Sequence, residues 1–74
     1  MSNIQKPTQI IKKGTAGEQV VWVQTMLTAL GYDCGGIDGV FGSKSVVATK
    51  KFQKENELTA DGVVGAKTAE VLWK

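Results

Sequence analysis

Apolar residues recur at helical spacing in the first half of the chain. Four of them follow at intervals of three, four and three, and would share one face of a helix: Val20, Val23, Leu27 and Leu30. Before them, Thr15 and Glu18 match the capping box that starts many helices. After them, Gly31 stands where a left-handed residue ends a helix. The pattern predicts a helix over residues 16–30.

Two further helices are expected, each preceded by a loop that contains glycine. Residues 32–42 include four glycines and are too irregular for a helix, although they could form a short β-bridge. The composition turns helical again over residues 43–56, where Ala48 and Phe52 share a face. A second loop at 58–65 precedes a closing helix at 66–73. The predicted fold class is therefore all-α, a compact three-helix bundle with two Asp-Gly loops.

The first thirteen residues differ from the rest of the chain. They are polar, contain the single proline and show no helical period. Residues 1–13 are therefore interpreted as a flexible tail or linker, with Ile10 and Ile11 as candidates to contact the core. The domain itself is predicted to span residues 14–74.

Composition excludes several classes of protein. Nine basic residues, all lysine, against seven acids give a net charge of +2, which is too weak a positive field for a good nucleic-acid binder. One cysteine and no histidine argue against an internal disulfide and a structural zinc site. No apolar run reaches membrane-spanning length, and no signal peptide opens the chain. We therefore expect no cofactor, no metal, no membrane contact and no nucleic acid.

An internal repeat marks the two loops. Residues 38–45 (DGVFGSKS) return as residues 61–68 (DGVVGAKT), 23 positions later. In each copy the aspartate can accept a hydrogen bond from the backbone two residues on, and the first glycine supplies a positive φ. The second glycine falls at or beside the N-cap of the next helix. Each copy thus predicts a turn followed by a helix start.

Duplicated loops of this kind also occur in calcium-binding modules. An EF-hand-type loop needs a bidentate acid at its twelfth position. With Asp38 or Asp61 at position five, the twelfth residue is Ser45 or Thr68, neither of which is an acid. Calcium binding is therefore disfavoured.

Catalysis is not expected either. A peptidase or amidase usually needs zinc or a nucleophile paired with histidine, and the chain has no histidine. Asp38 and Asp61 open equivalent turns, far from apolar segments that would raise the pKa of one of them for acid catalysis. Cys34 has no basic neighbour to activate it. The sequence predicts a domain that is not an enzyme.

Four stretches, in this order, are specific enough to suggest a family. They are G17-x-x-V-x-x-V-Q-x-x-L-x-x-L-G-Y32, D38-G-V-F-G42, A48-T-x-x-F-Q53 and L58-x-x-D-G-V-V-G-x-x-T68. Together they resemble the type 1 peptidoglycan-binding domain, a three-helix module of bacterial and phage cell-wall hydrolases. The chain departs from the family pattern at Thr49, at Glu57, where a glycine is common, and at Ala69, where an aromatic residue is common.

The resemblance implies a module that binds peptidoglycan, through its glycan strand, its stem peptide or both, without cleaving it. A covalently linked catalytic domain, such as an amidase or endolysin, is implied in a parent protein. Action at the bacterial cell wall or outside the cell is implied, by a bacterial or phage-encoded protein, and a monomer is expected. The alternative is a protein–protein interaction module that uses Trp22, Val46 and Val47 as an apolar patch.

Candidate ligand contacts combine aromatic rings, loop glycines and polar side chains near the loops. They are Trp22, Gln24, Tyr32, Asp38, Gly39, Phe41, Gly42, Lys44, Gln53, Asp61 and Gly62. Several have a second interpretation that the sequence leaves open. Phe41 could anchor the core, the aspartates could only stabilise their turns, and the two glutamines could bond the loop backbone.

Overall fold

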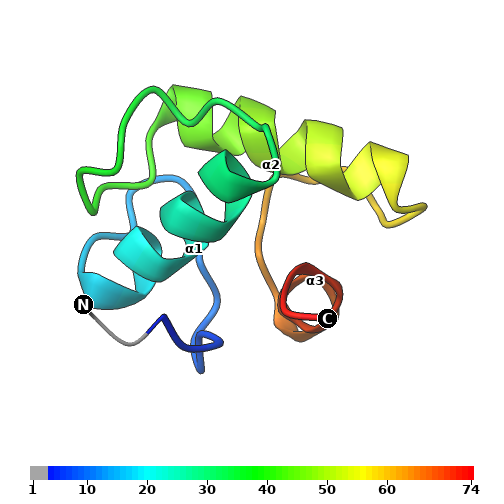
Figure 1. Ribbon diagram of the computed structural model, residues 1–74, viewed down its shortest axis with the longest axis horizontal. Coiled ribbons are helices and arrows are strands. Elements are labelled where there is room, and N and C mark those ends of the chain that lie inside the picture. The colour runs from blue at the N-terminus through cyan, green and yellow to red at the C-terminus, as the bar shows by residue number, and fades with distance from the viewer. Residues whose placement is uncertain (1–3) are drawn as a thin grey trace.

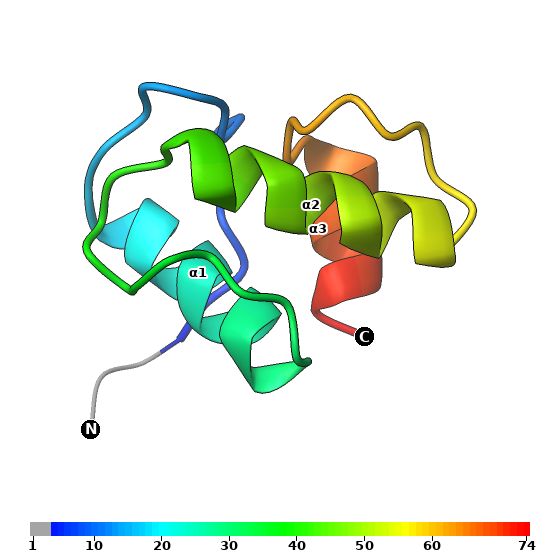
Figure 2. The ribbon, with the colours of Figure 1, turned by 90° about the horizontal axis from the view of Figure 1, so that it is seen from above.

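Three helices form the domain, with no strand among the described residues. The computed structural model describes residues 4–74, in which α1 spans Glu18–Ala29, α2 spans Ser43–Glu55 and α3 spans Ala66–Leu72. α2 lies across one side of the molecule, with α1 and α3 beneath its two halves (Figure 1 and Figure 2). The predicted all-α fold is confirmed, and each predicted helix lies within a few residues of its observed bounds.

The start of α1 differs from the prediction. Its N-cap is Gly17, with φ of 133° and no side-chain cap. The Thr15 hydroxyl instead accepts a hydrogen bond from the Lys12 amide at 3.1 Å, and the Thr15 carbonyl accepts one from the Phe41 amide at 2.8 Å. The predicted capping box is therefore wrong, because the Thr15 hydroxyl binds the Lys12 amide, three residues before it, in place of a helix amide.

The end of α1 follows the prediction. Gly31 has φ of 96°, and the Tyr32 amide donates to the Leu27 carbonyl at 2.8 Å. This is the Schellman arrangement, in which a left-handed residue closes the helix. Leu30, predicted on the buried stripe, is the C-cap residue and is 53% exposed, because the chain turns away from the core there.

Two isolated antiparallel bridges join the segment before α1 to the two loops, and the sequence had allowed a short bridge in a loop. Ala16 pairs with Val40, and Ile11 pairs with Val64. Ile11 is fully buried, whereas Ile10 is 62% exposed. Part of the predicted tail over residues 1–13 is therefore folded onto the domain through Ile11, one of the two residues expected to contact the core. The first three residues of the tail lie outside the described part.

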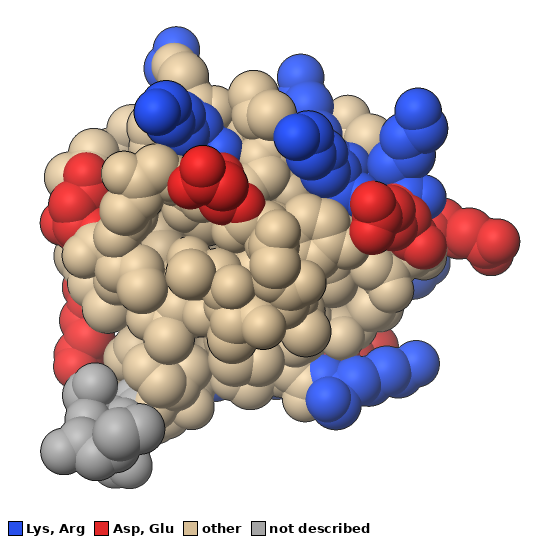
Figure 3. Space-filling model, turned by 45° about the horizontal axis from the view of Figure 1, so that its top comes forward, with Lys and Arg blue, Asp and Glu red and all other residues tan. Residues whose placement is uncertain are grey.

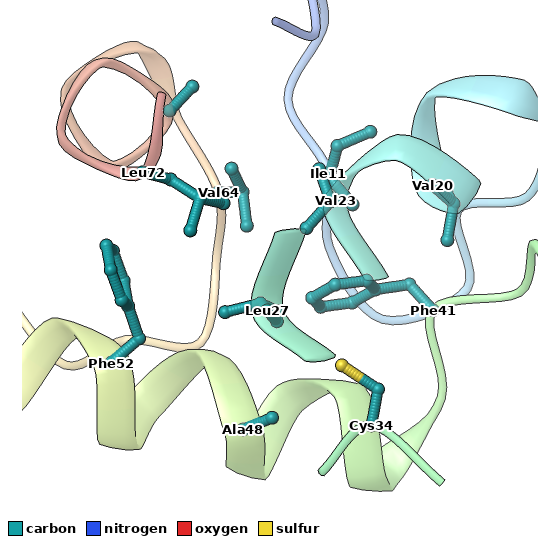
Figure 4. Packing of buried hydrophobic residues seen from close by; sticks show 11 residues of the cluster. Ile11, Val20, Val23, Leu27, Cys34, Phe41, Ala48, Phe52, Val64 and Leu72 are labelled. Carbon is teal, nitrogen blue, oxygen red and sulfur yellow. The ribbon is translucent and has the colours of Figure 1, made fainter. Parts of the chain in front are cut away.

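The core joins all three helices with the loops. Its buried hydrophobic members are Ile11, Val20, Val23, Leu27, Cys34, Phe41, Ala48, Phe52, Val64, Ala69 and Leu72. Figure 4 shows the Phe41 ring beside Leu27, with Phe52 and Leu72 on the other side of that leucine. Phe41 is fully buried, so its position agrees with the core-anchor interpretation. None of the helices in residues 4–74 has the length and hydropathy to cross a bilayer.

Candidate ligand-binding site

A buried glutamine on α1 holds the first Asp-Gly loop. Gln24 Nε2 donates to Asp38 Oδ1 at 3.2 Å, to the Val40 carbonyl at 2.9 Å and to Ser45 Oγ at 3.1 Å. Gln24 Oε1 accepts from the Gly39 amide at 2.9 Å. We call these five residues the first glutamine network. It joins α1, the loop and the first turn of α2.

The same arrangement recurs one helix later. Gln53 Nε2, on α2, donates to Asp61 Oδ1 at 3.0 Å, to the Val63 carbonyl at 2.9 Å and to Thr68 Oγ1 at 3.1 Å. Gln53 Oε1 accepts from the Gly62 amide at 2.9 Å. These five residues form the second glutamine network, so the duplicated unit includes the helix before each loop.

The sequence repeat did not reveal the two glutamines as equivalent. Gln24 precedes its aspartate by 14 residues, whereas Gln53 precedes its aspartate by eight. The first loop region is longer, so a fixed offset of 23 aligns the turns but not the glutamines. The signal available was the shared residue type, a glutamine in the helix that precedes each loop.

The turns themselves have the predicted geometry. Asp38 Oδ1 accepts from the Val40 amide, and Asp61 Oδ1 from the Val63 amide, both at 3.0 Å. These backbone hydrogen bonds, followed by those from the glutamines, lower the pKa of both aspartates. Gly62, with φ of 74°, also needs to be glycine because a Cβ there would lie 2.7 Å from Val46 Cγ1.

Five of the predicted ligand contacts are buried inside the domain. They are Gln24, Gly39, Phe41, Gln53 and Gly62. Both glutamines use their side-chain nitrogen and oxygen within the networks, which agrees with the loop-bonding interpretation. These residues shape the loops and do not offer an open surface to a polymer.

A pocket of about 280 Å³ opens beside the second loop. We call it the loop pocket, and its lining residues are Leu58, Thr59, Asp61, Val63, Gly65, Ala66, Lys67 and Thr68. A smaller pocket of about 130 Å³ shares Gly65 and Ala66 with it and continues along residues 7–10. The two pockets therefore lie next to each other around the start of α3.

A second large pocket, of about 300 Å³, lies beside Tyr32. We call it the Tyr32 pocket, and it is lined by Leu30, Tyr32, Phe52, Asn56, Val71, Leu72 and Lys74. The Tyr32 ring meets the Phe52 ring edge-on, with centroids 5.7 Å apart, and its hydroxyl donates to the Glu55 carboxylate. That hydrogen bond raises the pKa of Tyr32. The ring is thus held in place at the edge of a pocket, a role for Glu55 that the sequence did not suggest.

The remaining candidates are less distinctive. Trp22 is half-buried, and its buried Nε1 has no hydrogen-bond partner among residues 4–74. Gly42 is the N-cap of α2, as predicted. Lys44 is exposed but its chain lies against Gly35, where an added Cβ would be 2.6 Å from Lys44 Cδ.

The alternative apolar patch is only partly present. Val46 is half-buried and packs against the core, whereas Val47 is 51% exposed. Lysines gather along the upper edge of the surface in Figure 3, over α2, with acids between them. Among residues 4–74, no three cysteine, aspartate or glutamate side chains form a cluster that could hold a metal ion.

Comparison with known proteins identifies the family. The family model described as "Putative peptidoglycan binding domain" matches residues 16–72. The chain belongs to this peptidoglycan-binding domain family. It is 41% identical over 66 residues to a spore cortex-lytic enzyme of Bacillus cereus, covering 89% of the chain but 26% of that enzyme.

Solved structures of the family agree with the fold. The SleB N-terminal domain superposes with a TM-score of 0.89 at 38% identity, covering 93% of this chain and 94% of that one. The Burkholderia AP3 phage endolysin gives a TM-score of 0.83 at 34% identity, covering 86% of this chain and 24% of the endolysin. The resemblance found in the sequence is therefore confirmed, and the family is one of binding domains and not of catalytic domains.

Proposed function

We propose that this domain binds bacterial peptidoglycan without cleaving it and holds a linked hydrolase on the cell wall. Membership of the peptidoglycan-binding domain family over residues 16–72 carries the proposal. The matched spore cortex-lytic enzyme is named for lysis of the spore cortex, and the matched phage protein is named an endolysin. The chain spans about a quarter of that enzyme's length, which leaves most of such a protein for a separate catalytic domain.

The binding surface that we propose consists of the loop pocket and the Tyr32 pocket. Both are concave, with apolar walls and a few polar groups, as ligand sites usually are. From the candidate set, Asp61 lines the first pocket and Tyr32 the second. Trp22 is proposed as an additional partly exposed ring. The domain acts as a monomer, at the cell wall or outside the cell, in a bacterial or phage-encoded protein.

Binding by one such small module is expected to be weak for soluble fragments. Affinities in the micromolar to millimolar range correspond to about 4–8 kcal/mol. Attachment to a hydrolase and the many equivalent sites on a polymer convert weak binding into useful retention, because they raise the effective concentration.

A co-sedimentation experiment tests the proposal. The purified domain is mixed with peptidoglycan sacculi or with cellulose, an insoluble glycan without N-acetyl groups or peptides. We expect the domain to sediment with sacculi and to remain in solution with cellulose. Absence from the sacculus pellet, or equal recovery with both polymers, would contradict the proposed function.

A further inference from the structure

The two copies of the repeat differ in one respect that matters for binding. Lys44 and Lys67 occupy equivalent positions, six residues after the aspartate of each turn. Lys44 lies against Gly35, which belongs to the longer part of the first loop. Lys67 instead lines the open loop pocket of about 280 Å³ beside the shorter second loop. The longer first loop therefore packs against its lysine, whereas the second leaves a pocket.

The lining of the loop pocket suggests the chemistry of its ligand. Within residues 4–74, both hydrogen bonds accepted by the Asp61 side chain use Oδ1, which leaves Oδ2 as an acceptor. Lys67 and Thr59 add donors, while Leu58 and Val63 form apolar wall. Sugar rings offer matching groups, because they combine hydroxyl donors, an acetyl carbonyl and C–H faces.

The charges around Asp61 favour a neutral ligand over an amine. The Lys50 chain lies over the second turn, with Cε 3.3 Å from the position of a Cβ on Gly62. After the hydrogen bonds of its turn, the Lys50 charge also lowers the pKa of Asp61, and Lys67 lines the same pocket, so the carboxylate gains less from binding a further cation. The adjoining pocket along residues 7–10 would accommodate the next unit of a linear polymer.

We infer that the loop pocket binds the uncharged N-acetylated glycan strand of peptidoglycan, through Asp61 Oδ2, Thr59 and Lys67, and that the first loop has no equivalent site. The inference rests on the proposed function and names the part of the polymer that this pocket recognises. It assigns unequal roles to two loops with nearly identical backbone hydrogen bonding.

The duplication supplies a matched pair of variants. Asp61→Asn and Asp38→Asn each keep Oδ1 as the acceptor for the turn and the glutamine, and each replace Oδ2 by a donor group and remove the negative charge. We expect Asp61→Asn to weaken sacculus binding by about fivefold or more, and Asp38→Asn to stay within about twofold of the parent. Equal effects of the two variants, or none, would overturn the inference.

A second pair tests occlusion of the pocket. Gly65 and Gly42 are the N-cap residues of α3 and α2, have negative φ, and have nothing within 4 Å of an added Cβ. Asparagine is a favourable N-cap residue, so Gly65→Asn and Gly42→Asn should melt no lower than the parent. Only Gly65→Asn should bind sacculi more weakly, because Gly65 lines the pocket. Unchanged binding by a folded Gly65→Asn variant would contradict the assigned pocket.

The ligand class is tested with glycan strands freed of stem peptides by an amidase, which leaves a free carboxylate on each muramic acid, and with uncharged chitin oligosaccharides, which carry neither peptide nor carboxylate. Retained binding of the parent, with the same loss in Asp61→Asn, supports glycan recognition. Binding lost on removal of the peptides would overturn the glycan assignment in favour of the stem peptide. Failure of the parent to bind intact sacculi would instead contradict the proposed function itself, so the two failures are distinguishable.

Discussion

Replacing Gln53 with alanine is expected to remove a large part of the stability of the domain. The side chain makes four hydrogen bonds, two of them to the backbone of the second loop. Truncation leaves the buried Gly62 amide and the buried Thr68 hydroxyl without a partner. Each buried polar group left unsatisfied costs about 1–3 kcal/mol, so the two together cost about 2–6 kcal/mol.

That loss is large for a chain of 74 residues. At about 0.05–0.15 kcal/mol per residue, the whole domain has about 4–11 kcal/mol of stability. Urea denaturation followed by tryptophan fluorescence measures the change. Gln9→Ala is the control, because Gln9 is exposed and its replacement should change the unfolding free energy by less than about 0.5 kcal/mol.

A small loss of stability in Gln53→Ala would contradict the role of Gln53 in holding the second loop. A loss below about 1 kcal/mol in Gln53→Ala would mean that water replaces the network at little cost, so the glutamine does not hold the loop. Gln53→Glu gives a second measurement, because it keeps the acceptor for the Gly62 amide but places a second carboxylate beside Asp61. That variant should be least stable at neutral pH and partly recover as the pH falls, since protonation of the introduced carboxyl restores a donor.

Three further predictions follow from local geometry. Glu57 closes α2 in a left-handed conformation, with φ of 60°, which strains any residue that has a Cβ. Glu57→Gly should therefore stabilise the domain, by less than about 1.5 kcal/mol in urea melts. A loss of stability would contradict this backbone strain at Glu57. The pKa of Asp38 and that of Asp61 are lowered in the folded state, so both carboxylates stabilise the fold at pH values above the ordinary aspartate pKa. The free energy of unfolding should therefore fall below about pH 4, and fall less steeply in Asp38→Asn. Urea midpoints measured across this pH range would show the difference. Cys34 is buried, and burial raises the pKa of its thiol. A thiol reagent should therefore label Cys34 at least about tenfold faster in urea than in buffer. Equal labelling rates would contradict the burial of the thiol.

The features predicted correctly from sequence depend on short stretches of chain. The left-handed end of the first helix, at Gly31, follows from a helix-closing rule that spans about six residues. The two Asp-Gly turns and the N-cap glycines Gly42 and Gly65 follow from a pattern of five residues. Each of these conformations is decided by its own neighbours, so the sequence alone was sufficient.

The errors arise where a contact outside the expected helix pattern takes the group that the pattern assigned to it. Thr15 could have capped α1, but its hydroxyl bonds the Lys12 amide and its carbonyl bonds the Phe41 amide. Ile11 was expected as a candidate core contact, but nothing near it in sequence reveals that its partner is Val64. For the site, residue types indicated Tyr32 and Asp61, but which loop leaves a pocket depends on loop length and on how Lys44 packs.

The position of α2 explains how so small a domain holds two loops in place. Ser45, in its first turn, belongs to the first glutamine network, and Gln53, near its end, organises the second. Chains of this size usually need disulfides or metals in addition to a core. The chain has a single cysteine, and residues 4–74 contain no metal-binding cluster. In this domain, hydrogen bonds from the buried Gln24 and Gln53 side chains hold each loop to the neighbouring helices. Both networks therefore share α2, which fixes the first loop through its first turn and the second loop through its last.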